Sequence, residues 1–62
     1  MIASVDGKKR KLRFRGSVLQ LMQKLGLSRE EHIVKVNGKL ATDDEKVGEG
    51  DKVEIIKVVY GG

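Results

Sequence analysis

Apolar and polar residues alternate in several short runs of this 62-residue chain, which is the pattern of half-buried β-strands. The first apolar run ends at Asp6-Gly7, and the next run places Leu12 and Phe14 on one side. Asp-Gly between two strand-like runs favours a tight two-residue turn. The pattern therefore predicts a hairpin over about residues 1–15.

A helical spacing replaces the alternation after this hairpin. Apolar residues follow one another three and four positions apart, which gives one apolar stripe along a helix, formed by Val18, Leu21, Met22 and Leu25. Ser17 is a good N-cap and Gly26 suits a left-handed C-cap. We predict a short helix over about residues 17–25, with Leu19 off the stripe and exposed.

A second hairpin follows the helix. Residues 28–31 have the spacing of a capping box but room for a single turn only. Residues 33–36 resemble a strand, and Asn37-Gly38 favours a type I′ turn with positive φ at both positions. A return strand over residues 39–41 completes this hairpin.

The residue pattern in the last part of the chain predicts a polar connection, a turn and a final strand. Val47 is the expected inward anchor of the connection, and residues 52–59 form the strand. Alternation places Val53 and Ile55 on one face, with Ile56 and Val58 on the other. A strand that is apolar on both faces is typical of the centre of a sheet.

Charge is concentrated in one short segment. Six cations and no acidic residue fall within residues 8–15, although the whole chain carries a formal net charge of only +4. Such a segment is either the solvated outer side of a hairpin or a patch for an acidic partner or a nucleic-acid backbone.

Composition argues against catalysis by this chain. A domain of this size seldom encloses the roughly 300 Å³ of a ligand pocket, and there is no cysteine for a disulfide or a thiolate metal site. His32 is the only histidine, expected at the surface or at a strand end, and Asp43-Asp44-Glu45 is expected to be a solvated loop. We therefore expect no enzyme activity, no bound cofactor and no metal site. With no apolar run near the roughly 18 residues that span a bilayer, we expect a soluble, cytoplasmic protein.

Three segments together resemble the ubiquitin-like β-grasp family, and most of all its sulfur-carrier branch. They are SVLQLMQKLGL at residues 17–27, VKVNGK at residues 34–39, and EGDKVEII at residues 49–56 leading into VVYGG. This branch includes the thiamine-pathway carrier ThiS, the molybdopterin-synthase subunit MoaD and the small archaeal modifier proteins. The short length favours a ThiS-like or archaeal-modifier-like member.

The resemblance implies an α+β fold, a ubiquitin-like β-grasp with a mixed four- to five-stranded sheet and one helix packed across it. It implies one domain over residues 1–62, with the first and last strands parallel and a flexible tail over residues 59–62. It also implies a monomer that works with an adenylyltransferase resembling the ubiquitin-activating enzymes, with a persulfide sulfur donor, and with a sulfur-acceptor enzyme or target lysines. The partner uses ATP to adenylate the terminal glycine, which then becomes a thiocarboxylate or is conjugated to lysine.

The final residues carry the expected chemistry. Gly62 supplies the carboxylate, which is ionised at neutral pH because the α-carboxyl pKa is about 3.3–3.7. Gly61, Tyr60 and Val59 are the predicted recognition segment. Gly61 and Gly62 lack Cβ atoms and can therefore enter a narrow channel, whereas Tyr60 is either a contact with the activating enzyme or a semi-exposed aromatic at the root of the tail. A frayed tail without function is the alternative.

A partner surface is predicted beside this tail, formed by Ile56, Val58 and Leu19. The pathway stays open between thiamine, molybdopterin, tRNA thiolation and lysine conjugation. A basic β-grasp module that binds nucleic acid is the competing function, although only Phe14 and Tyr60 are aromatic.

Overall fold

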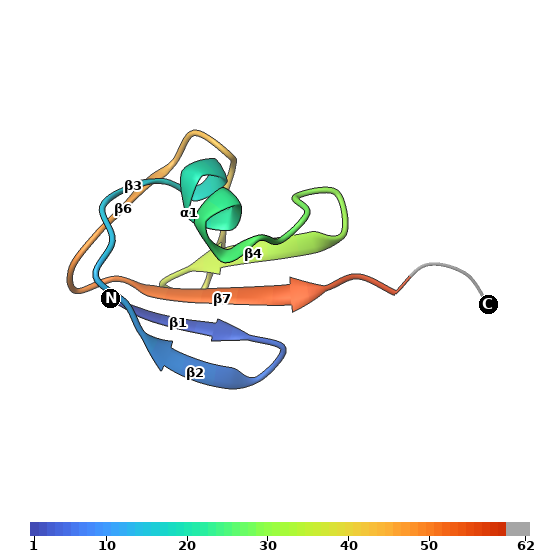
Figure 1. Cartoon of the computed structure of the whole chain (residues 1–62), viewed down its shortest axis with the longest axis horizontal. Helices are drawn as coiled ribbons and strands as arrows, with labels where there is room; N and C mark the ends of the chain where they lie inside the picture. Colours follow the sequence, from blue (N-terminus) through green and yellow to red (C-terminus); the bar gives the residue numbers. More distant parts are fainter. Residues whose placement is uncertain (60–62) are drawn as a thin grey trace.

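A five-stranded sheet with one helix lying across it is the main architecture of residues 1–59, which the computed structural model describes (Figure 1). The elements are β1 (Ile2–Val5), β2 (Lys8–Lys11), β3 (Gly16–Ser17), α1 (Val18–Leu25), β4 (His32–Val36), β5 (Lys39–Leu40), β6 (Lys46–Val47) and β7 (Lys52–Lys57). The short strands β3 and β6 pair separately. This arrangement confirms the predicted α+β class with a mixed sheet.

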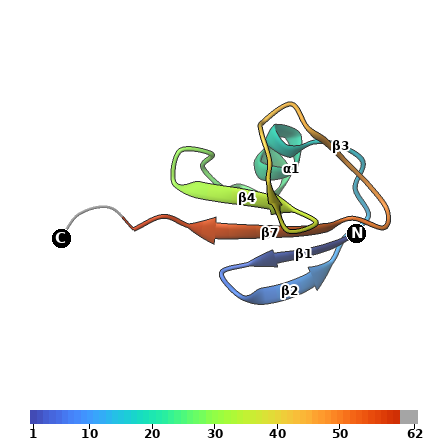
Figure 2. The same ribbon diagram turned by 180° about the vertical axis from the view of Figure 1, so that it is seen from behind.

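The last strand lies at the centre of the sheet, whose order is β2-β1-β7-β4-β5. β7 runs parallel to β1, with Val5 beside Ile55, and antiparallel to β4, with Val34 beside Ile55. Figure 2 shows α1 on one side of this sheet, and no other helix or strand of residues 1–59 covers the opposite side. The parallel pairing that the resemblance implied and the central place of β7 are both confirmed.

Helix α1 begins and ends where the sequence predicts. The Ser17 hydroxyl accepts a hydrogen bond from the Gln20 N–H at 3.1 Å, and the Gln20 side chain accepts one from the Ser17 N–H at 2.9 Å. This reciprocal capping satisfies two donors that would otherwise lack partners. Gly26 ends the helix at φ 71°, a left-handed conformation that glycine adopts without steric cost.

The core lies between α1 and the covered face of the sheet. Side chains of the helix stripe meet inward residues of β1, β4 and β7, and the buried apolar residues are Ala3, Val18, Leu21, Met22, Val34, Val36, Ala41, Val47, Val53 and Ile55. Burial of a full Leu or Ile side chain contributes about 1.5–3 kcal/mol, so these contacts dominate the stability of a small domain. The inward role predicted for Val47 is confirmed.

Both predicted hairpin turns are present. Asp6 and Gly7 have φ values of 49° and 86°, and Asn37 and Gly38 have 52° and 85°. Positive φ at both central residues is the geometry that matches the twist of the flanking strands.

The second strand is shorter than predicted. β2 ends at Lys11, and Leu12 and Phe14 pack against the core from irregular backbone, half-buried. The chain must leave the sheet here to reach the helix layer, where Gly16 and Ser17 pair with β6. The final strand also ends early, at Lys57 rather than at residue 59.

His32 is the first residue of β4, which confirms the strand-end position, one of the two that were predicted. Its side chain is buried. The imidazole Nδ1 lies 2.7 Å from the Ser28 carbonyl oxygen, and this hydrogen bond makes the burial tolerable. The Asp43–Glu45 loop is exposed, as predicted.

Asp51 closes the turn before β7. Its carboxylate accepts hydrogen bonds from the Asn37 side-chain amide at 3.0 Å and from the Gly48 N–H at 2.8 Å. These bonds, with Asn37 making the larger contribution, lower the pKa of Asp51 below its ordinary value of 3.8.

Acid should therefore weaken the fold through Asp51. Because its pKa is lower in the folded protein than in the unfolded chain, its contribution is complete above the ordinary pKa and is lost as the pH falls through the folded pKa. We expect Asp51→Ala to lower Tm at a pH of about 7 and to lower it less at a pH of about 2.5. Thermal melts at both pH values test this, with Glu49→Gln as control. An equal Tm difference at both pH values would contradict the prediction.

Among residues 1–59 there is no helix with the length and apolar character needed to cross a lipid bilayer.

Candidate functional site

The root of the C-terminal tail is the first part of the candidate site. β7 ends between the Asp6-Gly7 turn and the turn over residues 28–31, and Val58 and Val59 follow it beyond the end of the sheet (Figure 1). Val58 is half-buried, and Val59 is 86% exposed. The predicted roles of Tyr60, Gly61 and Gly62 lie outside the described residues, as does most of the predicted tail.

Two hydrogen bonds hold this root from opposite sides. The Lys57 N–H donates to the Asp6 carboxylate at 2.9 Å, and the Val58 N–H donates to the Glu31 carbonyl at 2.8 Å. The Asp6 N–H in turn donates to the Ile55 carbonyl at 3.0 Å. The bonds extend support for β7 to Val58, so the tail starts at a fixed point of the fold.

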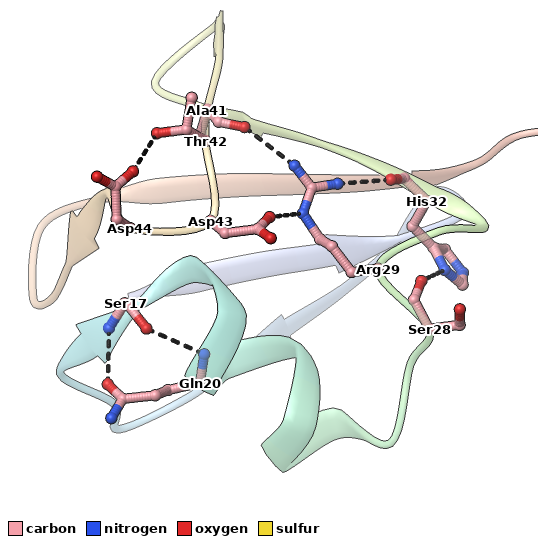
Figure 3. A network of polar contacts seen from close by, with 9 residues as sticks. All are labelled: Ser17, Gln20, Ser28, Arg29, His32, Ala41, Thr42, Asp43 and Asp44. Atoms are coloured by element: carbon pink, nitrogen blue, oxygen red, sulfur yellow. Dashed lines mark hydrogen bonds and ion pairs between the residues drawn. The ribbon is translucent and has the colours of Figure 1, made fainter.

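Arg29 fixes the turn that supplies the Glu31 carbonyl. Its guanidinium donates to the His32 carbonyl at 2.7 Å, to the Ala41 carbonyl at 3.1 Å, and to the Asp43 carboxylate (Figure 3). One side chain thus ties the turn before β4 to the loop after β5. The tail root is consequently braced by the body of the domain.

The open face of the sheet is the second part of the candidate site. Ile33 and Ile56 lie directly opposite each other on β4 and β7, and they are 41% and 42% exposed. Leu40 lies on the same face because it pairs with Lys35, and it is 70% exposed. We call Ile33, Ile56 and Leu40 the open-face cluster. Apolar side chains gathered on one exposed face are typical of protein interaction sites.

The structure separates the three residues predicted to form a partner surface. Ile56 lies in β7 and Val58 directly follows its last residue, so both are near the tail root. Leu19 lies on α1, which covers the opposite face, and is 38% exposed. Leu19 therefore does not extend the surface around Ile56, and their part in partner binding stays a prediction.

Sequence reasoning missed two members of the open-face cluster and the supports of the tail root. Alternation on β4 gave a usable signal for Ile33, since Val34 and Val36 point inward. Nothing in the sequence pairs Asp6 or Glu31 with the end of β7, because these contacts join residues far apart in the chain.

The described part of this site presents two kinds of surface. The tail root presents hydrogen-bonded backbone, and the open-face cluster presents apolar side chains. Phe14 packs against the core, so it offers no stacking platform for a nucleobase. The arrangement therefore suits docking to a protein that works on the tail.

Asp6→Gly should loosen the tail root. Glycine tolerates the positive φ of this turn position but lacks the carboxylate that accepts from Lys57. Loss of one hydrogen bond should speed hydrogen exchange of the Lys57 amide about fivefold, as followed by NMR. Asp6→Asn is the matched control, because its side-chain oxygen can still accept. Unchanged exchange in Asp6→Gly would show that the carboxylate does not hold the root.

Comparisons with known proteins agree with this geometry. A family model described as the ThiS family matches residues 3–62. The fold is also similar to the crystal structure of a thiamine biosynthesis protein (ThiS) from Geobacter metallireducens, with a TM-score of 0.70 and 28% sequence identity over 100% of both chains. The likeness confirms the predicted ubiquitin-like β-grasp fold.

Proposed function

Since the chain belongs to the ThiS family, we propose that it is a sulfur carrier of thiamine biosynthesis that bears sulfur on the carboxyl group of Gly62. The family match carries this proposal, because it extends over the whole last strand and the Gly61-Gly62 pair. The likeness to the Geobacter protein over the full length of both chains supports it.

In the proposed reaction, the Gly62 carboxylate first attacks the α-phosphorus of ATP. A new bond forms between a carboxylate oxygen and this phosphorus while the bond to pyrophosphate breaks, which leaves an acyl adenylate. A persulfide sulfur of a donor protein then attacks the acyl carbon, and AMP leaves. Reductive cleavage of the sulfur–sulfur bond by a thiol yields the thiocarboxylate.

We assign catalysis to the partner, and to this chain the task of presenting its terminal carboxylate. Acceleration of adenylation needs correct positioning of both reactants and stabilisation of charge on the phosphates. An adenylyltransferase would provide both, together with the ATP site. The carrier itself contributes a carboxylate on a narrow tail whose root Asp6 and Glu31 hold in place.

The open-face cluster is the proposed docking surface for this enzyme. It lies on the side of the sheet that α1 leaves uncovered, and Ile56 is three residues before Val59, where the predicted tail begins. A partner that covers Ile33 and Ile56 would therefore meet the tail as it leaves the fold. We place the carrier, as a single-domain monomer, in the cytoplasm, with a sulfur-acceptor enzyme as its last partner.

Exchange of labelled pyrophosphate into ATP tests the adenylation step. The chain is incubated with an adenylyltransferase that activates a ThiS protein, ATP, magnesium and labelled pyrophosphate. We expect exchange that depends on this chain and increases with its concentration until the enzyme is saturated. Exchange no faster than with enzyme alone would contradict the proposal, and conjugates to lysine in place of sulfur transfer would assign the chain to protein modification.

A further inference from the structure

Strand β2 forms one edge of the sheet and carries only cationic side chains. Its sequence is Lys8-Lys9-Arg10-Lys11, all four residues are exposed, and its neighbour in the sheet is β1 alone (Figure 1). An edge strand presents backbone donors and acceptors on its outer side, which can pair with a further strand. The feature is therefore an exposed sheet edge with a strong positive charge.

The cations of this edge outnumber the acids near them in the sequence, of which Asp6 is the nearest. Residues 8–15 hold six of the thirteen Lys and Arg residues and no acid. The other seven cations face nine acids, so the rest of the chain has a net charge of −2. The ion pair that the structure records, between Arg29 and Asp43, involves none of the six. The edge is thus a local source of positive potential on an otherwise slightly acidic chain.

The register shows which backbone groups are available. Met1 and Leu12 exchange both backbone hydrogen bonds, at 2.9 and 3.0 Å. Hydrogen-bonded and non-hydrogen-bonded pairs alternate along an antiparallel ladder, so Arg10 and Lys8 bond to β1. The N–H and C=O groups of Lys9 and Lys11 therefore point away from β1, toward a strand that could lie beside them.

A groove runs between this edge and the end of the helix. Its volume is about 330 Å³, and it is lined by Val5, Asp6, Lys8, Arg10, Leu25 and Leu27. Lys8 lies opposite Val5 and Arg10 opposite Ala3, which places both cations on the helix side of the sheet. The Asp6 carboxylate is occupied by the Lys57 N–H. The groove is therefore lined by the apolar side chains of valine and leucine, with two cations and the hydrogen-bonded Asp6 carboxylate beside them.

We propose that β2 binds an extended acidic segment of a partner protein, which adds to the sheet as a further strand. Its backbone pairs with the outward groups of Lys9 and Lys11. Alternate side chains of the segment enter the groove against Leu25 and Leu27, and its carboxylates face the cations of β2. Strand addition of this kind takes affinity from backbone hydrogen bonds and specificity from pockets for alternate side chains.

Two observations favour an acidic peptide over a nucleic acid. The apolar lining of the groove is aliphatic, which suits Val, Ile or Leu side chains and gives no stacking surface for bases. The free groups of the edge alternate between donor and acceptor, as a peptide backbone requires. The same lysines repel a second basic β2, so the edge discourages pairing between copies while it attracts an acidic strand.

The inference stands apart from the proposed sulfur chemistry, since it uses neither Gly62 nor an adenylyltransferase. Removal of Gly62 should leave peptide binding unchanged. A failed adenylation assay and a failed peptide assay would thus overturn different claims.

Binding of a fluorescent peptide to the full chain tests the proposal. The probe has about ten residues that alternate valine and glutamate, long enough to cover the whole edge. We expect saturable binding at low salt that weakens as salt is added. In NMR spectra of the full chain, the peptide should shift the amides of Lys9 and Lys11 and slow their hydrogen exchange. Absence of binding, or shifts centred on another element, would overturn the proposal.

Two variants at Lys9 separate strand pairing from simple charge attraction. Lys9→Pro and Lys9→Gln remove the same charge, but only proline also removes the outward N–H. The Lys9 N–H does not bond to β1, and edge strands tolerate proline at positions whose N–H faces outward. We expect Lys9→Pro to bind the peptide about tenfold more weakly than Lys9→Gln, the effect of about 1.4 kcal/mol. Equal affinities would exclude strand addition.

A second pair of variants tests the groove and remains informative if Lys9→Pro fails to fold. Lys8→Glu combined with Arg10→Glu should weaken peptide binding about tenfold or more, because like charges then face the probe. Two exposed lysines outside the edge provide the control, as Lys39→Glu combined with Lys46→Glu. Equal losses of peptide affinity in both double variants would show that only the net charge of the protein matters, and would contradict binding at the groove. Tighter binding of a uridine oligonucleotide that displaces the peptide would assign the edge to nucleic acid instead.

Discussion

Deletion of Gly62 is expected to abolish sulfur loading completely. The proposed chemistry takes place on the carboxylate of this residue, and no side chain can supply an equivalent group at the same distance from the fold. The shortened chain ends in the Gly61 carboxylate, one residue short of the ATP site of the partner. Since a displacement of about 1 Å can cost 100-fold in rate, a shift of one residue, about 3.5 Å, should leave no measurable adenylation.

The deletion should leave the fold intact, which makes the loss interpretable. The last described hydrogen bond to the chain end is that from the Val58 N–H to Glu31, so Tm should not change. A chain with one alanine added after Gly62 is the matched control, because it keeps every residue and moves only the carboxylate. It should be inactive as well. Sulfur on either variant would place the chemistry elsewhere.

Ile56→Glu should lower kcat/KM for activation of the chain by its adenylyltransferase about 30-fold. The side chain lies in the open-face cluster opposite Ile33, where a docked partner would exclude water. Burial of a charge without a partner there should cost about 2 kcal/mol, the loss typical of an interface hot spot, and tenfold corresponds to about 1.4 kcal/mol. The effect should appear mainly in KM for the carrier, since the reacting carboxylate is unchanged.

Ile2→Glu gives a closely matched control for this prediction. Ile2 is 42% exposed, as Ile56 is, and lies on the same open face, but its partner on β7 is Lys52, at the far end from the tail. Both variants should fold, as judged by Tm. Equal losses of activation from Ile2→Glu and Ile56→Glu would show that the partner does not select the end of the sheet beside the tail.

Local chemistry in the sequence predicted the parts of the fold that depend on neighbouring residues. Asn37-Gly38 specifies its turn because few residue pairs accept two positive φ values. Ser17 and Gly26 specify the ends of α1 through their own backbone and side-chain preferences. The spacing of the helix stripe identified its buried face for the same reason.

Features that depend on distant residues were missed. The pairing of Gly16 with Val47 and the end of β2 at Lys11 follow from where the chain crosses between layers, which alternation does not encode. The burial of His32 was missed for a different reason, because its partner, the Ser28 carbonyl, is only four residues away but comes within reach only in the folded turn.

In the candidate site, too, features set by neighbouring residues could be predicted and features set by distant residues could not. Ile56 was predicted to be exposed beside the tail because the strand is apolar on both faces. Ile33 was missed, although alternation along β4 places it on the same open face. The hydrogen bond from the Lys57 N–H to the Asp6 carboxylate could not be predicted, since 51 positions separate these residues in the chain. The parallel pairing of β1 with β7 came from the family resemblance, because strand spacing does not distinguish parallel from antiparallel neighbours.

The intact mass of the protein after reconstitution tests the sulfur-carrier role most directly. The chain is incubated with the adenylyltransferase, ATP, a persulfide donor and a thiol reductant, and its mass is then measured. We expect a gain equal to the exchange of one oxygen for one sulfur, with fragment ions that place the sulfur on Gly62. An unchanged mass, in a reaction that converts an established ThiS protein in parallel, would contradict the proposed function.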